Sequence, residues 1–160
     1  MNPTDENDID LASLRTLVGK SLGVSEWFAV TQESIDIFAA ITHDRDPIHN
    51  DPLWAINGPF GGTIAHGFFV LSMLGKFSRE IGLPGSTSEK YVALNYGLDR
   101  VRFIAPVKIG ARIRNHAVLA SIDQKSPEKF VLSTTNSIEI EGSKRPCMVA
   151  HLLTMVIRRC

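Results

Sequence analysis

The strongest constraint on the fold is a run of apolar residues that would surround a helix on almost every side. Between residues 66 and 81 the apolar positions follow no single face, and a helix without a polar face has to be buried. Everything after residue 90 instead favours strands separated by turn-forming residues. The sequence therefore predicts an α+β fold in which an antiparallel sheet wraps around one long apolar helix. The expected strands are 91–98, 100–104, 111–122, 129–141 and 146–157.

The first half of the chain predicts shorter elements. Thr31 is the expected N-cap of a helix that ends before Pro47, because the residue preceding a proline avoids the α region. Asp51 and Pro52 are typical of the start of a further short helix. Before these come a polar tail, a helix with apolar residues at a spacing of three and four, and a strand, which we place at residues 1–8, 11–22 and 25–30.

Length and composition favour a single domain with an ordinary globular interior. A chain of 160 residues without internal repeats is most simply one domain, which we place at residues 21–160, preceded by a tail and short helix at 1–20. The 17 basic and 17 acidic residues give a net charge of +0, which argues against nucleic acid or an anionic membrane as the main partner.

Targeting and cysteine signals are weak in this sequence. The acidic residues at the N-terminus are unlike a signal peptide, and no apolar run is long enough to span a bilayer. We therefore expect a cytoplasmic protein. Cys147 and Cys160 stand in no metal-binding spacing and are expected to be reduced and inert.

Carboxylates and imidazoles are concentrated between residues 43 and 51, where prolines stiffen the backbone. Asp44 and His49 on one short loop can share a water molecule: one side chain takes its proton, while the other orients it or returns a proton to the substrate. The two residues are therefore a candidate general acid–base pair. The loop alone does not exclude the alternative that Asp44 caps a helix and His49 makes a hydrogen bond within the loop.

The same loop also invites a metal-binding interpretation, because His43, Asp46 and Asp51 add further donor atoms. Histidines with several carboxylates suit a divalent cation. However, these donors alternate along an irregular loop instead of sharing a helix face, as they do in His-Glu-x-x-His. We therefore favour a solvated charged loop and expect no metal.

A second candidate feature is the glycine-rich segment that precedes the apolar run. Gly67 follows His66 where the buried helix is expected to begin, and the first N–H groups of a helix lack partners within it. Such an N–H can stabilise a carbonyl that turns into an enolate-like oxyanion. The alternative is that Gly61, Gly62 and Gly67 simply permit a tight turn. The segment lacks the Gly-Lys-Ser/Thr ending of a phosphate-binding loop.

Three blocks of this sequence resemble the MaoC-like hydratase/dehydratase family of the hotdog fold. The family's first block runs from an aromatic residue through Gly-Asp-x-Asn-Pro, a hydrophobic residue and His to a small residue. Its places are taken here by Phe38, Thr42, Asp44, Pro47, Ile48, His49 and Ala55. Residues 59–68 resemble the second block and residues 94–107 the third. The residues of these blocks are most similar to those of the (R)-specific enoyl-CoA hydratases and of the nodulation protein N-like subgroup. The resemblance covers residues 25–157.

This resemblance implies a fold, an assembly and a reaction. The sheet would wrap the long helix, and two identical subunits would shelter the active site. Asp44 and His49 would hold the water, and the Gly67 N–H would polarise the thioester carbonyl, with His66 beside it as a substrate-binding candidate. The implied reaction adds water to a trans-2-enoyl thioester of CoA or acyl carrier protein, or removes it from an (R)-3-hydroxyacyl thioester. The family needs no metal or redox cofactor.

Two residues depart from the family pattern. His43 replaces the glycine before Asp44, and Asp46 replaces an asparagine that could donate a hydrogen bond to Asp44. Neighbouring carboxylates repel, which favours the protonated form of one of them, and His43 can offset this by pairing with Asp46. We expect the acid–base machinery to persist with an altered pH dependence. Two alternatives stay open: a thioesterase, since other hotdog proteins perform that reaction, and a non-catalytic module that binds acyl thioesters.

Overall fold

The structure of the chain is a computed structural model that describes residues 11–82 and 90–159. Its helices are α1 (Leu11–Arg15), α2 (Gln32–Thr42), α3 (Pro47–Asn50), α4 (Pro52–Ala55), α5 (Gly67–Ser72) and α6 (Leu74–Ile81). Its strands are β1 (Ser21–Val24), β2 (Phe28–Ala29), β3 (Tyr91–Phe103), β4 (Arg112–Ser126), β5 (Lys129–Ile140) and β6 (Pro146–Arg158). The tail expected over residues 1–8 lies outside the described residues.

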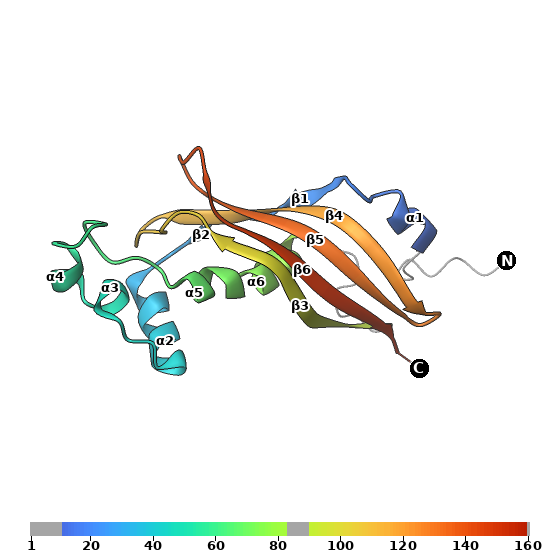
Figure 1. The fold of residues 1–160 in the computed structure, drawn as a ribbon, viewed down its shortest axis with the longest axis horizontal. Coiled ribbons are helices and arrows are strands. Elements are labelled where there is room, and N and C mark those ends of the chain that lie inside the picture. The colour runs from blue at the N-terminus through green and yellow to red at the C-terminus, as the bar shows by residue number, and fades with distance from the viewer. Residues whose placement is uncertain (1–10, 83–89, 160) are drawn as a thin grey trace.

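The described strands form one antiparallel sheet in the order β1-β4-β5-β6-β3, and β2 also pairs with β4. Along β4, every second side chain from Ile113 to Leu119 is buried, because successive side chains of a strand point to opposite faces. Helices α5 and α6 lie along one face of this sheet (Figure 1). The predicted antiparallel sheet wrapped around an apolar helical segment is thereby confirmed.

Two groups of buried apolar side chains hold the helices to the sheet. The larger one packs Phe69, Val70 and Phe77 of α5 and α6 against the central strands. The smaller one lies toward α1 and includes Leu14 and Phe130. Burial of this kind stabilises the fold by about 25 cal/mol for each Å² of apolar surface removed from water, so the helix–sheet contact contributes to stability.

Several element boundaries differ from the prediction. The single helix expected over residues 66–81 is interrupted at Met73, so that α5 and α6 are separate segments. It is also less enclosed than expected, since the Phe68 side chain is 68% exposed. The helix expected over 11–22 ends at Arg15, and Gly19 then adopts a φ of 82° that a helix does not allow. The two strands expected over 91–104 are one strand, β3, with irregular register on either side of residues 97–99.

Helices α2, α3 and α4 project beyond one end of the sheet (Figure 1). As predicted, Thr31 caps α2: its hydroxyl accepts a hydrogen bond from the Ser34 N–H. The short helix predicted at Asp51 and Pro52 is α4, and the Asp51 carboxylate accepts from the Trp54 N–H at its start. Of the strand expected over 25–30, Phe28 and Ala29 form the strand β2, and the Ser25 N–H also donates to the carbonyl of Asn115 in β4. No helix within residues 11–82 and 90–159 has the length and apolar character needed to cross a bilayer.

Candidate active site

The loop that joins α2 to α3 carries Asp44. His43 ends α2 in the left-handed conformation, with a φ of 60°. Asp46 then starts α3, because its carboxylate accepts a hydrogen bond from the Ile48 N–H at 3.1 Å. The pairing expected between His43 and Asp46 is not among the ion pairs of the described residues. Asp46 is therefore occupied as a helix cap, and α3, which the sequence did not predict, presents His49.

The side chain of His49 has a defined proton position. Its Nδ1 lies 2.7 Å from the carbonyl oxygen of Ile64. A carbonyl oxygen only accepts hydrogen bonds, so Nδ1 carries the proton and donates it. In the neutral ring, Nε2 therefore keeps its lone pair and is free to accept a proton. This is the ring nitrogen that a general base requires.

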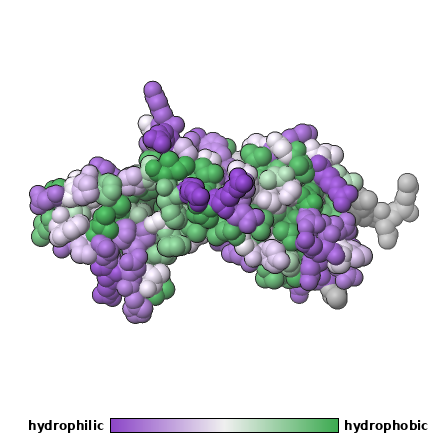
Figure 2. Space-filling view, viewed as in Figure 1, coloured by the Kyte–Doolittle hydropathy of each residue, from purple (hydrophilic) through white to green (hydrophobic). Residues whose placement is uncertain are grey.

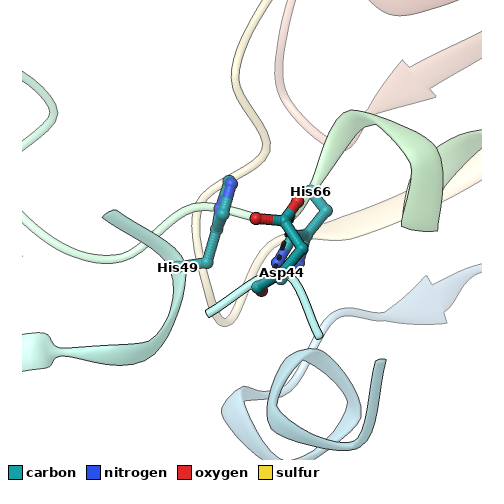
Figure 3. Close-up of side chains that lie close together, drawn as sticks. All are labelled: Asp44, His49 and His66. Carbon is teal, nitrogen blue, oxygen red and sulfur yellow. Dashed lines mark hydrogen bonds and ion pairs between the residues drawn. The ribbon is translucent and has the colours of Figure 1, made fainter. Parts of the chain in front are cut away.

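The side chain of His66 lies directly against the His49 ring and also contacts Asp44 (Figure 3). The two imidazoles are stacked, and His66 is only 2% exposed. The Nε2–H of His66 donates to the backbone carbonyl of Asp44 at 2.9 Å, and the same nitrogen is 3.9 Å from the Asp44 carboxylate. His66, the expected substrate-binding residue, thus makes its contacts with the other site residues. One ring nitrogen of each histidine and one carboxylate oxygen of Asp44 lie within 4.8 Å of one another, a spacing that one water molecule can bridge.

The same three residues are the ones placed to share a cation. Asp44, His49 and His66 supply one carboxylate and two imidazoles, which are ligand types of transition metals. Two of the further donors considered from the sequence are used elsewhere. Asp46 and Asp51 both accept backbone N–H bonds at helix starts.

A pocket of about 290 Å³ opens beside His49 and the start of α5. Gly67 lines this pocket, and among the described residues no acceptor pairs with its N–H. A side chain at Gly67 would not fit without adjustment, since a Cβ there would lie 3.1 Å from the ring of Phe103. Gly61 and Gly62 have φ values of 64° and 150°, which agrees with the tight-turn interpretation for those two. The pocket wall consists of His49, Ile64, Ala65, Gly67, Val70, Phe103, Ile104, Ala105, Pro106, Val107 and Cys147.

Sequence reasoning named the side chains of this site and missed the groups that hold them. Ile64 contributes its backbone carbonyl, and no pattern in the sequence indicates where a backbone carbonyl will bind a side chain. Phe103 belongs to the third block, but nothing in the pattern of that block indicated contact with Gly67. The stacking of His49 on His66 joins two blocks whose approach depends on the fold.

Comparison with known proteins shows the family and the fold of this chain. The sequence matches the MaoC like domain family over residues 13–140. It is 42% identical over 151 residues to nodulation protein N of Rhizobium leguminosarum bv. viciae, covering 94% of this chain and 92% of that protein. It is 35% identical over 147 residues to 3-hydroxyacyl-thioester dehydratase Z of Mycobacterium tuberculosis, covering 92% of this chain and 95% of that one. The solved structure of an (R)-hydratase from A. caviae involved in PHA biosynthesis, 19% identical, shares the fold with a TM-score of 0.69 over 86% of this chain and 94% of that chain. This chain therefore belongs to the MaoC-like dehydratase family of hotdog proteins.

Proposed function

We propose that this protein is an acyl-thioester hydratase/dehydratase that interconverts a trans-2-enoyl thioester and an (R)-3-hydroxyacyl thioester. The observation that carries the proposal is the hydrogen bond from His49 Nδ1 to the Ile64 carbonyl, because it leaves Nε2 as a proton acceptor in the wall of the pocket. Family membership and a dehydratase among the relatives support the same reaction class.

In the hydration direction, Asp44 and His49 hold one water between them. His49 takes a proton from the water while Asp44 orients it, and the water oxygen bonds to C3 of the enoyl group. The electron pair of the C2–C3 double bond moves toward the thioester oxygen, where the Gly67 N–H stabilises the developing negative charge. C2 then receives a proton back from the His49–Asp44 pair, so that water is added in full. Dehydration is the reverse, and CoA and acyl carrier protein are both suitable carriers for the thioester.

The same proposal includes a homodimer. β3 ends the strand order of the sheet formed by the described residues, and its Leu94, Tyr96 and Leu98 side chains are between 42% and 56% exposed. Figure 2 shows hydrophobic residues at the surface in the middle of the molecule, where Figure 1 places α5 and β3. A group of exposed apolar side chains on one strand is typical of a surface that contacts a second chain. Light scattering after size exclusion would test this: a monomer at micromolar concentration contradicts the dimer.

The reaction is tested by following crotonyl-CoA and longer enoyl-CoAs at the enoyl-thioester absorbance, with free thiol measured in parallel. Loss of enoyl absorbance without thiol supports hydration, thiol release indicates a thioesterase, and binding without either product indicates a non-catalytic module. Asp44→Asn and His49→Gln should each lower kcat by about 10²- to 10⁴-fold, the usual contribution of acid–base catalysis. Unchanged rates in both variants would show that the site is placed wrongly.

A further inference from the structure

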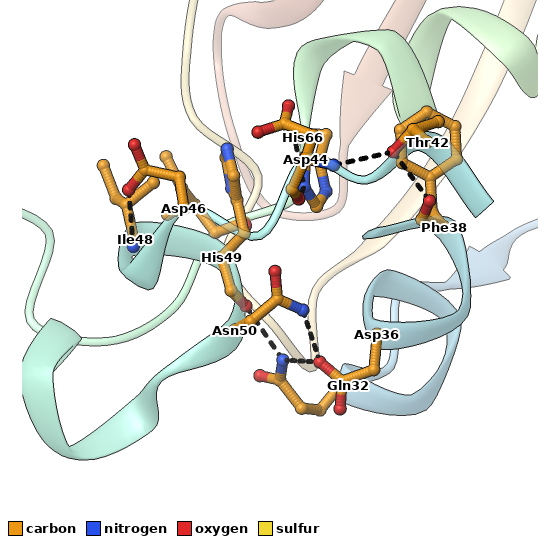
Figure 4. A network of polar contacts seen from close by, with 11 residues as sticks. Gln32, Asp36, Phe38, Thr42, Asp44, Asp46, Ile48, His49, Asn50 and His66 are labelled. Carbon is orange, nitrogen blue, oxygen red and sulfur yellow. Dashed lines mark hydrogen bonds and ion pairs between the residues drawn. The ribbon is translucent and has the colours of Figure 1, made fainter. Parts of the chain in front are cut away.

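Beside the loop that carries Asp44, hydrogen bonds join α2 to α3 (Figure 4), and one further bond joins α2 to Thr63. Gln32 stands at the centre of them, as the first residue of α2. Its side-chain Nε2 donates to the backbone carbonyl of His49 at 2.8 Å and to the Asp36 carboxylate at 2.8 Å. Its Oε1 accepts a bond of 2.7 Å from the Thr63 hydroxyl.

These contacts use every polar group of the Gln32 amide. Two N–H groups and one oxygen are each paired, so the orientation of the amide is fixed by its partners. The carbonyl of His49 lies in the last turn of α3, where helix carbonyls have no partner within the helix. Gln32 supplies the donor that this carbonyl lacks. Asp36 holds the residue after His49 in the same way, because its carboxylate also accepts a hydrogen bond from Asn50 Nδ2 at 2.6 Å.

The side chain and the backbone of His49 are consequently both held by one short stretch of chain. The Ile64 carbonyl accepts a hydrogen bond from the His49 ring, and the Ile64 N–H donates to the carbonyl of Ile48. Thr63, the preceding residue, is 6% exposed and acts on the His49 backbone through Gln32. The ring and the backbone of His49 are therefore both positioned by Thr63 and Ile64.

We propose that Gln32 is a positioning residue for the reaction: its amide, oriented by Thr63, fixes the backbone of His49 so that Nε2 faces the pocket. This inference rests on the function proposed above. Gln32 does not line the pocket, so it acts through His49 and not on the substrate. Misplacing a reacting group by about 1 Å costs roughly 100-fold in rate, so a loss of positioning should appear in kcat and leave KM nearly unchanged.

The sharpest variant is Gln32→Glu, which keeps the shape and the Thr63 bond. Its second carboxylate oxygen would face the His49 carbonyl and the Asp36 carboxylate, with no hydrogen to donate. We expect kcat to fall by about 10- to 100-fold at neutral pH. The ratio of variant to wild-type activity should rise as the pH is lowered, because protonation of the introduced carboxylate restores a donor. Gln124→Glu, an exposed site on β4, makes the same change of charge and serves as the control.

A second pair of variants avoids any new charge. Thr63→Val keeps the shape of Thr63 but removes the hydroxyl that orients the amide, whereas Thr63→Ser keeps the hydroxyl. We expect kcat to fall several-fold in Thr63→Val and to stay near the wild-type value in Thr63→Ser. If kcat in Gln32→Glu and Thr63→Val stays within two-fold of Gln124→Glu and Thr63→Ser, the inference is wrong. Should Gln32→Glu fail to fold, the Thr63 pair decides.

Nitrogen-15 NMR of the His49 ring separates this inference from the proposed function, because it needs no turnover. In the wild type we expect Nδ1 to be the protonated nitrogen, and in Gln32→Glu and Thr63→Val a mixture of the two tautomers. A protein inactive on every enoyl thioester would refute the proposed function. Ring nitrogen shifts identical to wild type in both variants would refute the positioning role, whatever the activity.

Discussion

The imidazole of His49 lies against the imidazole of His66, with ring centroids 3.8 Å apart and ring planes inclined by 29°. Each ring donates one N–H to a backbone carbonyl, His49 to Ile64 and His66 to Asp44. The exposed Asp44 loop and the pocket wall are therefore joined through two stacked side chains. A disturbance of either histidine should consequently reach both the loop and the pocket.

The two contacts of His66 can be separated by two substitutions. His66→Gln keeps an amide N–H in place of Nε2 but loses the ring that stacks on His49. His66→Phe keeps a ring but leaves the Asp44 carbonyl without its donor, which should cost about 1–3 kcal/mol of stability. We expect kcat to fall about 10-fold in both variants, and the free energy of unfolding in urea to fall more in His66→Phe. Full kcat in either variant would mean that the corresponding contact does not serve catalysis.

Gly67→Ala should impair activity more than stability. The new Cβ would approach the Phe103 ring at 3.1 Å, and Phe103, which is 49% exposed, would have to move at the pocket wall. We expect kcat/KM to fall at least 10-fold, with little change in unfolding free energy. Gly75→Ala on α6 is the matched control, since its Cβ meets nothing within 4 Å. There alanine should stabilise by about 0.5–1 kcal/mol with activity unchanged. Equal kcat/KM in the two variants would contradict the role of Gly67.

Asp46 should show separable effects of its hydrogen bond and its charge. Asp46→Ala loses the cap of α3 and should lower stability by about 1 kcal/mol, whereas Asp46→Asn keeps a capping oxygen and should be nearly neutral. The altered pH dependence expected from the sequence should depend on the charge of Asp46, so the pH–rate profile of Asp46→Asn should differ from that of the wild type. Superimposable pH–rate profiles for the wild type and Asp46→Asn would show that Asp46 does not affect the pH dependence of the reaction.

Cys147 should be unreactive in the folded protein. Burial raises the pKa of this thiol to about 12, so almost no thiolate is present at pH 8. In a Cys160→Ser background, an aromatic disulfide reagent should react only after the protein unfolds. The thiol of the unfolded chain ionises near its ordinary pKa of 9.0, whereas the buried thiol ionises with a pKa of about 12. Ionisation of this thiol should therefore leave the free energy of unfolding unchanged below pH 9 and lower it between pH 9 and 12. Rapid labelling of the native protein at pH 8 would contradict this.

The parts of the fold that follow from local rules were predicted from the sequence. The start of α2 at Thr31 and of α4 at Asp51 depend on side chains that bond the adjacent backbone, so the signal is local. The long strands β4 to β6 were recognised within a few residues, because turn-forming residues stand between them. The helix expected over 11–22 failed because apolar side chains from a turn and a strand can fill the same cluster as a helix, as Leu17 and Leu22 do.

The candidate site divides in the same way. Asp44, His49 and Gly67 were identifiable because their chemistry belongs to their side chains or to the absence of one. The contacts that orient them depend on chain segments brought together by the fold, such as Thr63 against Gln32. They also depend on backbone atoms, for which every residue type is equivalent. Helix α3 begins with the same Asp-Pro pair as α4, at Asp46 and Pro47, but the prediction used Pro47 only to mark the end of α2.

The bond between His49 and the Ile64 carbonyl has a consequence for how this protein tolerates change. In the proposed reaction, the proton acceptor is aligned by a main-chain oxygen, and the thioester would be met by the main-chain N–H of Gly67 a few residues later. Replacing the side chain of Ile64 leaves both atoms in place, whereas inserting or deleting one residue between Thr63 and Gly67 moves one relative to the other. Substitution of the Ile64 side chain is therefore permitted, whereas a change in the length of this stretch is not.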